Sequence, residues 1–111
     1  MKRNMRLYIN DIWESILAIE EYTRSISEDE FYKDRQVQDA VIRRLEIIGE
    51  AVKNIDDDFR NNYTDIPWKK IAGMRDIIAH EYFGIKLERI WDAATKDLPK
   101  LKKKFYRIIK T

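Results

Sequence analysis

The chain has 111 residues, with 22 Lys and Arg against 20 Asp and Glu, one His, no Cys, three Gly and two Pro. A chain of this length buries one hydrophobic core but not two, so we expect one domain over residues 1–111. The lack of cysteine excludes thiol catalysis, disulfides and Cys-ligated metal centres, and one histidine excludes a metal site built on two imidazoles from one chain. Charged residues form 38% of the chain while Gly and Pro are rare, which favours long helices with large polar faces.

The amino-terminal end carries no pattern typical of export. Residues 1–6 are basic like the start of a signal peptide, but Asp11 and Glu14 interrupt the next segment, and the longest apolar run is only Ile16–Ile19. No membrane-spanning segment can be drawn from such a short run. We therefore expect a cytoplasmic protein that does not associate with a membrane.

The first half of the chain predicts two long amphipathic helices. Apolar residues recur at three- and four-residue steps from Leu7 to about Ser25, and again from about Gln36 to Ile55. Between them, Ser27 is followed three residues later by Glu30, which is the pattern of a capping box and predicts a short additional helix. Gly49 weakens the second long helix by about 0.5–1 kcal/mol relative to alanine, so it indicates a tight contact with another helix there.

An acidic connection comes after the second long helix. Residues 56–65 are rich in Asp and Asn and lack a clean period, so we expect a loop with one helical turn. Its three successive aspartates, 56–58, could hold a cation, but a solvated acidic turn is the expected interpretation. Pro67 suits the first position of a third long helix, which should run to about Tyr82 or Phe83 and end at Gly84.

The last helix carries one apolar seam from Leu87 to Ile108. Pro99 interrupts it, because proline lacks the N–H that would bond to the carbonyl of Thr95, so we expect a kink or a break into two collinear helices near Asp97. The sum is an all-α fold, an antiparallel bundle of four main helices plus short extra helices. Three tryptophans are expected to pack between helices rather than stack on bases: Trp13, Trp68 and Trp91.

The carboxyl-terminal helix is strongly basic. Residues 96–111 contain seven Lys and Arg residues but only one acidic residue. Two interpretations stay open, a solvated helix face and a patch that attracts a polyanion such as RNA.

His80 is the only imidazole of the chain, and imidazole is the side chain that by nature exchanges a proton near neutrality. General acid–base catalysis would therefore depend on it. At 100° per residue, Met74 and Ile78 align with Ile71 on the core side of the helix, while His80 lies nearly opposite. Asp76 lies one turn before His80 on the same side, where it can orient the imidazole ring.

Arg75 lies about 140° around the helix from His80, so one straight helix cannot aim both side chains at one point. The stripe opposite the core contains Gly73, Ile77, His80 and Gly84, whose small residues permit close approach and favour a homodimer. Two copies of Arg75 and His80 suit RNA cleavage. One group takes the proton of the 2′-hydroxyl, another protonates the leaving 5′-oxygen, and the arginine stabilises the phosphate charge.

The stretch Arg75–Tyr82 has the pattern Arg, four residues, His, any residue, Tyr. With this motif the chain resembles the HEPN superfamily, and more closely the HepT-like toxins. Other blocks of that family's pattern occur in the same order, so the resemblance covers nearly the whole chain: Ile48–Ala51, Ile66–Trp68, Gly73–Met74 and Ile90–Trp91.

The resemblance implies a HEPN-like helical domain that forms a homodimer with a composite cleft and acts as a metal-independent endoribonuclease. It implies that Arg75 and His80 are the catalytic residues, with Asp76 in support and no cofactor. Glu50 can either enter the cleft as a further supporting residue or remain on the surface of its helix. The resemblance further implies the toxin of a type VII-like toxin–antitoxin system, whose MntA-like nucleotidyltransferase antitoxin transfers AMP from ATP to Tyr82. An adenylyl group on Tyr82 would place a phosphate beside Arg75 and so block RNA.

Two other functions stay open from the sequence. The chain could be a non-catalytic HEPN module that only binds the nucleotidyltransferase, with Tyr82 as a packing residue, or a helical adaptor without either partner. Arg75 also fits an ordinary ion pair with Glu50 or Asp76, and this role is compatible with catalysis.

Overall fold

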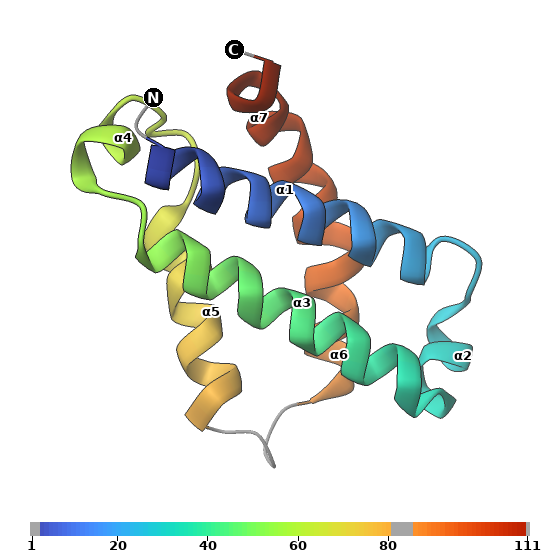
Figure 1. Ribbon diagram of the computed structural model, residues 1–111. Helices are drawn as coiled ribbons and strands as arrows, with labels where there is room; N and C mark the ends of the chain where they lie inside the picture. The colour runs from blue at the N-terminus through green and yellow to red at the C-terminus, as the bar shows by residue number, and fades with distance from the viewer. Residues whose placement is uncertain (1–2, 81–85, 111) are drawn as a thin grey trace.

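Figure 1 shows the computed structural model, which describes residues 3–80 and 86–110, without the side chains of residues 77, 79 and 80. Four long helices form the frame: α1 (Arg3–Thr23), α3 (Arg35–Lys53), α5 (Trp68–His80) and α7 (Leu98–Lys110). Four shorter segments connect them: α2 (Glu28–Lys33), α4 (Asp57–Asn61), α6 (Leu87–Asp92) and the π-helical η2 (Ala93–Asp97). The described residues contain no strand, and the predicted all-α fold is confirmed.

Helix α3 is the centre of the arrangement, because it packs against both α1 and α5. Helices α1 and α3 run antiparallel, and α6, η2 and α7 form one continuous rod whose upper part packs against α1 (Figure 1). Most fully buried side chains come from the apolar positions that recur at helical spacing, and the largest of these include Ile9, Ile12, Ile16, Ile19, Phe31, Val41, Ile48, Val52, Phe105 and Ile108. The polar Ser15 of α1 is fully buried as well. The periodic pattern therefore predicted the main buried positions of the long helices.

The two long helices of the first half differ from their predicted bounds by a few residues. Helix α1 begins at Arg3, a turn before Leu7, because Met5 is buried and extends the apolar stripe toward the amino terminus, and it ends at Thr23. Helix α3 begins after Asp34, whose carboxylate accepts the N–H of Val37 at 3.2 Å, and it ends at Lys53. Ile55 lies beyond that end but is still buried in the core.

The predicted capping box and the predicted helical turn in the acidic connection are both present. Ser27 Oγ accepts the N–H of Glu30 at 3.1 Å, and Glu30 Oε1 accepts the N–H of Ser27 at 3.1 Å, which completes the predicted capping box. Asp56 caps α4 by accepting the N–H of Phe59 at 2.9 Å, so the acidic turn serves as a helix start. Across residues 3–80 and 86–110, no three or more His, Asp or Glu side chains cluster as they would to hold a metal ion.

The predicted break in the last helix takes the form of a π turn. The N–H of Leu98 bonds to the carbonyl of Ala93, five residues earlier, just before Pro99. The wider turn lets the rod continue past a residue that has no N–H to donate. The apolar seam is preserved through the π turn, because Ala94, Leu98 and Phe105 are all buried. Helix α5 starts at Trp68, one residue after Pro67, while the predicted end near Tyr82 to Gly84 lies outside the described residues.

Helix α7 forms hydrogen bonds with Asp65 in the loop before α5. Arg107 donates from one nitrogen to both carboxylate oxygens of Asp65, at 2.7 and 2.6 Å, and Lys104 Nζ donates to the Asp65 carbonyl at 2.8 Å. The hydrogen bond from Arg107 holds the pKa of Asp65 below its ordinary value of 3.8. Lys102 pairs in the same way with Glu20 of α1, at 2.8 Å, and lowers the pKa of that carboxyl group.

The lowered pKa of Asp65 predicts a loss of stability in acid. The unfolded chain takes up a proton on Asp65 more readily than the folded chain, so the stabilisation is present above pH 3.8 and is lost as the pH falls below it. We expect Asp65→Asn to lower the melting temperature at neutral pH, and the gap to the parent chain to close in acid. Thermal unfolding from neutral to acidic pH measures this. A gap that stays constant through the acid range would contradict the assignment.

Candidate active site

Helix α5 presents Arg75 at the edge of its core face. Ile78 is buried, Ile71 and Met74 are half-buried against the core, and the Arg75 side chain is 33% exposed. This matches the direction that helical geometry predicts for each of the four residues. The backbone of Arg75 is thus held by packing of α5 against the core, while its guanidinium group reaches the surface.

The contact between α3 and α5 is closest at Gly49. A Cβ atom added to Gly49 would overlap the Cβ of Arg75 and would lie 3.2 Å from its Cα. Rotation of the arginine side chain cannot relieve the clash, because it moves neither the Cβ nor the Cα atom of Arg75. The predicted tight contact at Gly49 is confirmed, and its partner is Arg75 itself.

Two carboxylates flank the guanidinium of Arg75. Arg75 Nε lies 3.0 Å from Glu50 Oε2, and Arg75 NH1 lies 3.8 Å from Asp76 Oδ1. The same oxygen of Asp76 is 2.5 Å from Lys53 Nζ of α3. Because all four side chains are a third or more exposed, these pairs contribute little to stability. Their effect is to restrict the orientation of Arg75.

The structure therefore brings together three of the predicted site residues, Arg75, Asp76 and Glu50. Lys53 was not among the predicted site residues. A signal was present, because Lys53 comes three residues after Glu50 and so lies on the same face of α3. The interaction with Asp76, however, depends on how α3 and α5 pack.

The groove beside Arg75 leaves room for a ligand. It has a volume of about 210 Å³, and its lining includes Arg75 and Glu50 together with Tyr8, Arg43 and Asn54. The backbone of His80 forms the last residue of α5, five positions after Arg75. The side chain of His80, and the whole of Tyr82, lie outside the described residues.

The described helices form an all-α fold and place Arg75 at a groove, five positions before His80 on the same helix, in agreement with the HEPN-like domain that the motif predicts. The HepT-like family, described as ribonuclease HepT-like, matches residues 12–108. The chain therefore belongs to this family, and the resemblance drawn from its motifs is confirmed.

Individual relatives agree with this family. The chain is 50% identical over 109 residues to "Gamma-glutamylcyclotransferase and putative RNase MJ0434" of Methanocaldococcus jannaschii, which covers 98% of this chain and 49% of that protein. The chain thus spans about half the length of that relative. It is 47% identical over 110 residues to "Probable ribonuclease HepT" of Thermococcus cleftensis, which covers 99% of this chain and 100% of the relative. The comparison with solved structures finds no match.

These names place the chain among ribonuclease-like HEPN proteins, in agreement with the predicted enzyme class. None of the helices described in Figure 1 combines the length and the apolar character needed to cross a membrane.

Proposed function

We propose that the chain is a metal-independent endoribonuclease that works as a homodimer, with Arg75 and His80 as its catalytic residues. The observation that carries this proposal is the position of Arg75, rigid at its base and held by Glu50 and Asp76 beside an open groove. The ribonuclease names of the relatives support the substrate class.

In this mechanism the 2′-hydroxyl of one nucleotide attacks the adjacent phosphorus and the bond to the 5′-oxygen breaks. The imidazole of one His80 takes the 2′-hydroxyl proton, and the protonated imidazole of the second copy gives a proton to the leaving 5′-oxygen. Arg75 donates hydrogen bonds to the phosphate oxygens as negative charge builds up on them. Glu50 and Asp76 act as positioning residues, and Asp76 also orients the ring of His80 one turn away.

A second copy of the chain supplies the second imidazole. Among the atoms that the structure describes, a Cβ atom added to Gly73 would meet nothing within 4 Å, so the described part of the chain leaves space beside this glycine. Gly73 belongs to the stripe opposite the core, which was predicted to pack against a second copy of the chain. An open, small-residue position on that face supports close approach of a second α5.

A cleavage assay with purified protein tests the proposal. We expect end-labelled single-stranded RNA to be cut equally well with and without a chelator, and an all-deoxy oligonucleotide of the same sequence to remain intact. Loss of cleavage with the chelator would contradict the metal-independent mechanism. Cutting of the deoxy substrate would contradict attack by the 2′-hydroxyl.

We further propose that the chain is the toxin of a toxin–antitoxin pair and that AMP transfer to Tyr82 silences it. The transfer breaks the bond between the α- and β-phosphates of ATP, joins the α-phosphate to the Tyr82 oxygen and releases pyrophosphate. The new anionic phosphate competes with RNA for Arg75. ATP is used by the MntA-like partner, and the chain itself needs no cofactor.

Intact mass after incubation with the partner and ATP tests this step. We expect a gain of one or more AMP units together with loss of cleavage, and neither effect in Tyr82→Phe. A tight complex with no mass gain and no RNA cleavage would instead support the second candidate, a non-catalytic module that binds the nucleotidyltransferase. The ion pairs of Arg75 fit that candidate equally well, because an arginine of purely structural role makes the same contacts.

A further inference from the structure

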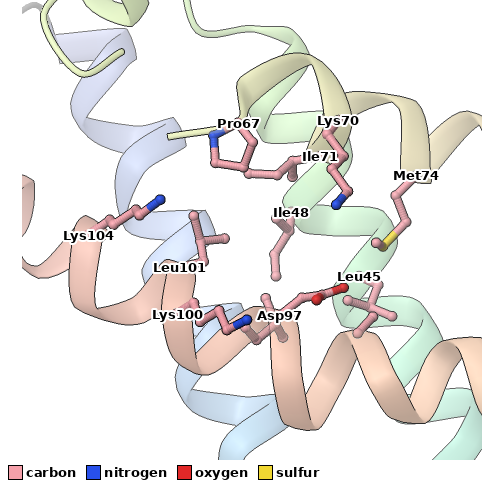
Figure 2. A pocket seen from close by; sticks show the side chains of 12 residues that line it. Leu45, Ile48, Pro67, Lys70, Ile71, Met74, Asp97, Lys100, Leu101 and Lys104 are labelled. Carbon is pink, nitrogen blue, oxygen red and sulfur yellow. The ribbon is translucent and has the colours of Figure 1, made fainter. Parts of the chain in front are cut away.

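A second hollow, separate from the groove at Arg75, opens between α5 and the rod of η2 and α7. It has a volume of about 220 Å³, and Leu45 and Ile48 of α3 form part of its lining (Figure 2). Ile71 and Met74 line it from α5 and Leu101 from α7, so most of its surface is apolar. Because Met74 directly precedes Arg75, the hollow and the groove lie on neighbouring faces of the same helix.

Three lysines surround this apolar lining. Lys70 comes from α5, and Lys100 and Lys104 come from α7 on the opposite side (Figure 2). Within the described part of the chain, neither Lys70 nor Lys100 has a carboxylate within 4.0 Å, and Lys104 donates to a neutral carbonyl oxygen. By contrast, Lys102 on the same helix is paired with Glu20. The positive charge around the hollow is therefore available to an anionic ligand.

Asp97 is the single carboxylate in the lining. Its side chain points toward Leu45 and Met74 in the hollow, and its Oδ2 atom lies 3.8 Å from Arg89, a long and exposed pair (Figure 2). A carboxylate at this position can accept a hydrogen bond from the exocyclic amino group of a base. Cytosine, adenine and guanine have such a group, whereas uracil does not.

We propose that the hollow binds one unpaired base of single-stranded RNA, with the phosphates on either side of that base contacting Lys70 and Lys100. The inference rests on the proposed ribonuclease function and adds a substrate-binding site to it. An apolar lining suits the faces of a base, which single-stranded RNA can turn outward and a duplex cannot. The volume is below the roughly 300–1,000 Å³ of pockets that enclose a drug-sized ligand, so it suits one ring system.

The placement of the lysines distinguishes a strand from a free nucleotide. A free mononucleotide carries its phosphate on one side of the base, whereas an internal nucleotide of a strand has a phosphate before it and another after it. Cations on both α5 and α7 match the second arrangement. The strand would then continue across α5 toward Arg75, on the neighbouring face.

Methyl NMR of methionine locates the contact in the parent chain, and a substitution is needed only to assign the signal. We would label the Met methyl groups with ¹³C and add a short 2′-O-methyl oligocytidylate, which lacks the attacking hydroxyl and is not cleaved. The signal of Met74, assigned with Met74→Leu, is expected to shift. The signal of Met5, buried in α1 away from the hollow, serves as the control and is expected to stay in place.

The salt dependence of RNA binding tests the lysines. The logarithm of the RNA-binding constant decreases linearly with the logarithm of the salt concentration. For single strands the steepness of this decrease drops by about 0.7 for each phosphate contact that is lost. We expect this drop in steepness, with several-fold weaker binding, in Lys70→Gln and in Lys100→Gln. Lys103→Gln is the matched control, because Lys103 is exposed on α7, carries the same charge and does not line the hollow. Asp97→Ala should reduce the preference for oligocytidylate over oligouridylate.

The outcomes separate this inference from the proposed function. If Lys70→Gln and Lys100→Gln bind RNA like Lys103→Gln while cleavage still depends on His80, the hollow is not a binding site and the ribonuclease assignment stands. If the parent chain neither binds nor cuts RNA, both fail. Binding of AMP as tight as that of the oligomer, or a Met74 shift caused by the nucleotidyltransferase but not by RNA, would also overturn the inference.

Discussion

Replacing His80 by alanine is expected to slow RNA cleavage by about 10²- to 10⁴-fold, the usual contribution of a general acid or base. The chain has no second imidazole that could take over the proton transfer. Folding should be unaffected, because the helical positions that pack in the core, such as Ile78, lie on the other side of α5. Single-turnover cleavage and circular dichroism measure the two quantities. Cleavage that persists in a folded His80→Ala protein would contradict the assignment.

Substitution of Arg75 tests the stabilisation of phosphate charge, whereas substitution of His80 tests proton transfer. Arg75→Lys keeps the charge but loses the planar fork that binds two phosphate oxygens, so we expect a loss of about 10²- to 10³-fold, as for other donors to a developing oxyanion. Glu50→Gln weakens only the orientation of Arg75, so its loss should be smaller. Removal of Arg75 also leaves Glu50 and Asp76 without the cation between them, and the fold of each variant must be checked.

Mixing the parent chain with an inactive variant tests the shared cleft. Because the proposed cleavage uses the His80 imidazole of both protomers, a dimer of one parent chain and one His80→Ala chain keeps only one of the two imidazoles. We expect cleavage to fall below the share of parent chains in the mixture after the two proteins are combined and allowed to exchange subunits. Cleavage that stays proportional to the share of parent chains, with mixed dimers detected by mass, would place a complete working site in one chain.

The periodic apolar positions could be predicted because burial on one helix face is a local property of the sequence. The capping box at Ser27, the helical turn in the acidic connection and the break before Pro99 were also predictable, since each depends on hydrogen bonds between residues close in the chain. The early start of α1 was missed because Met5 lies in a basic stretch that resembled the start of a signal peptide and lacks the apolar period of the residues after it.

Features that depend on contacts between helices far apart in the sequence were harder to predict. The pairing of Lys53 with Asp76, and the hollow lined from α3, α5 and α7, require the packing of these helices, which periodicity does not specify. The same holds for the basic carboxyl-terminal helix. Its spacing could not show that Lys102 and Arg107 are paired with acidic residues of other segments while Lys100 borders an apolar hollow.

The contact between Gly49 and Arg75 leads to the prediction with the largest effect on stability. In Gly49→Ala the new methyl group would overlap Arg75 at its Cβ and press on its Cα, so α3 and α5 must separate. Overpacking of this kind usually costs about 1–3 kcal/mol in the free energy of unfolding. Movement of α5 also displaces Arg75, so we expect cleavage to fall even where the variant remains folded. Urea unfolding and cleavage assays measure the two effects.

Gly73→Ala is the matched control, since both glycines lie inside long helices. A Cβ at Gly73 meets none of the described atoms within 4 Å, so alanine there should stabilise the folded chain by about 0.5–1 kcal/mol, the usual gain from glycine to alanine in a helix. If a second copy packs on this face, the same methyl group should weaken the dimer, which analytical ultracentrifugation detects. Equal destabilisation by both substitutions would show that general helix effects, rather than the Arg75 contact, determine the role of Gly49. A more stable monomer with an unchanged dimer would place the twofold interface away from Gly73.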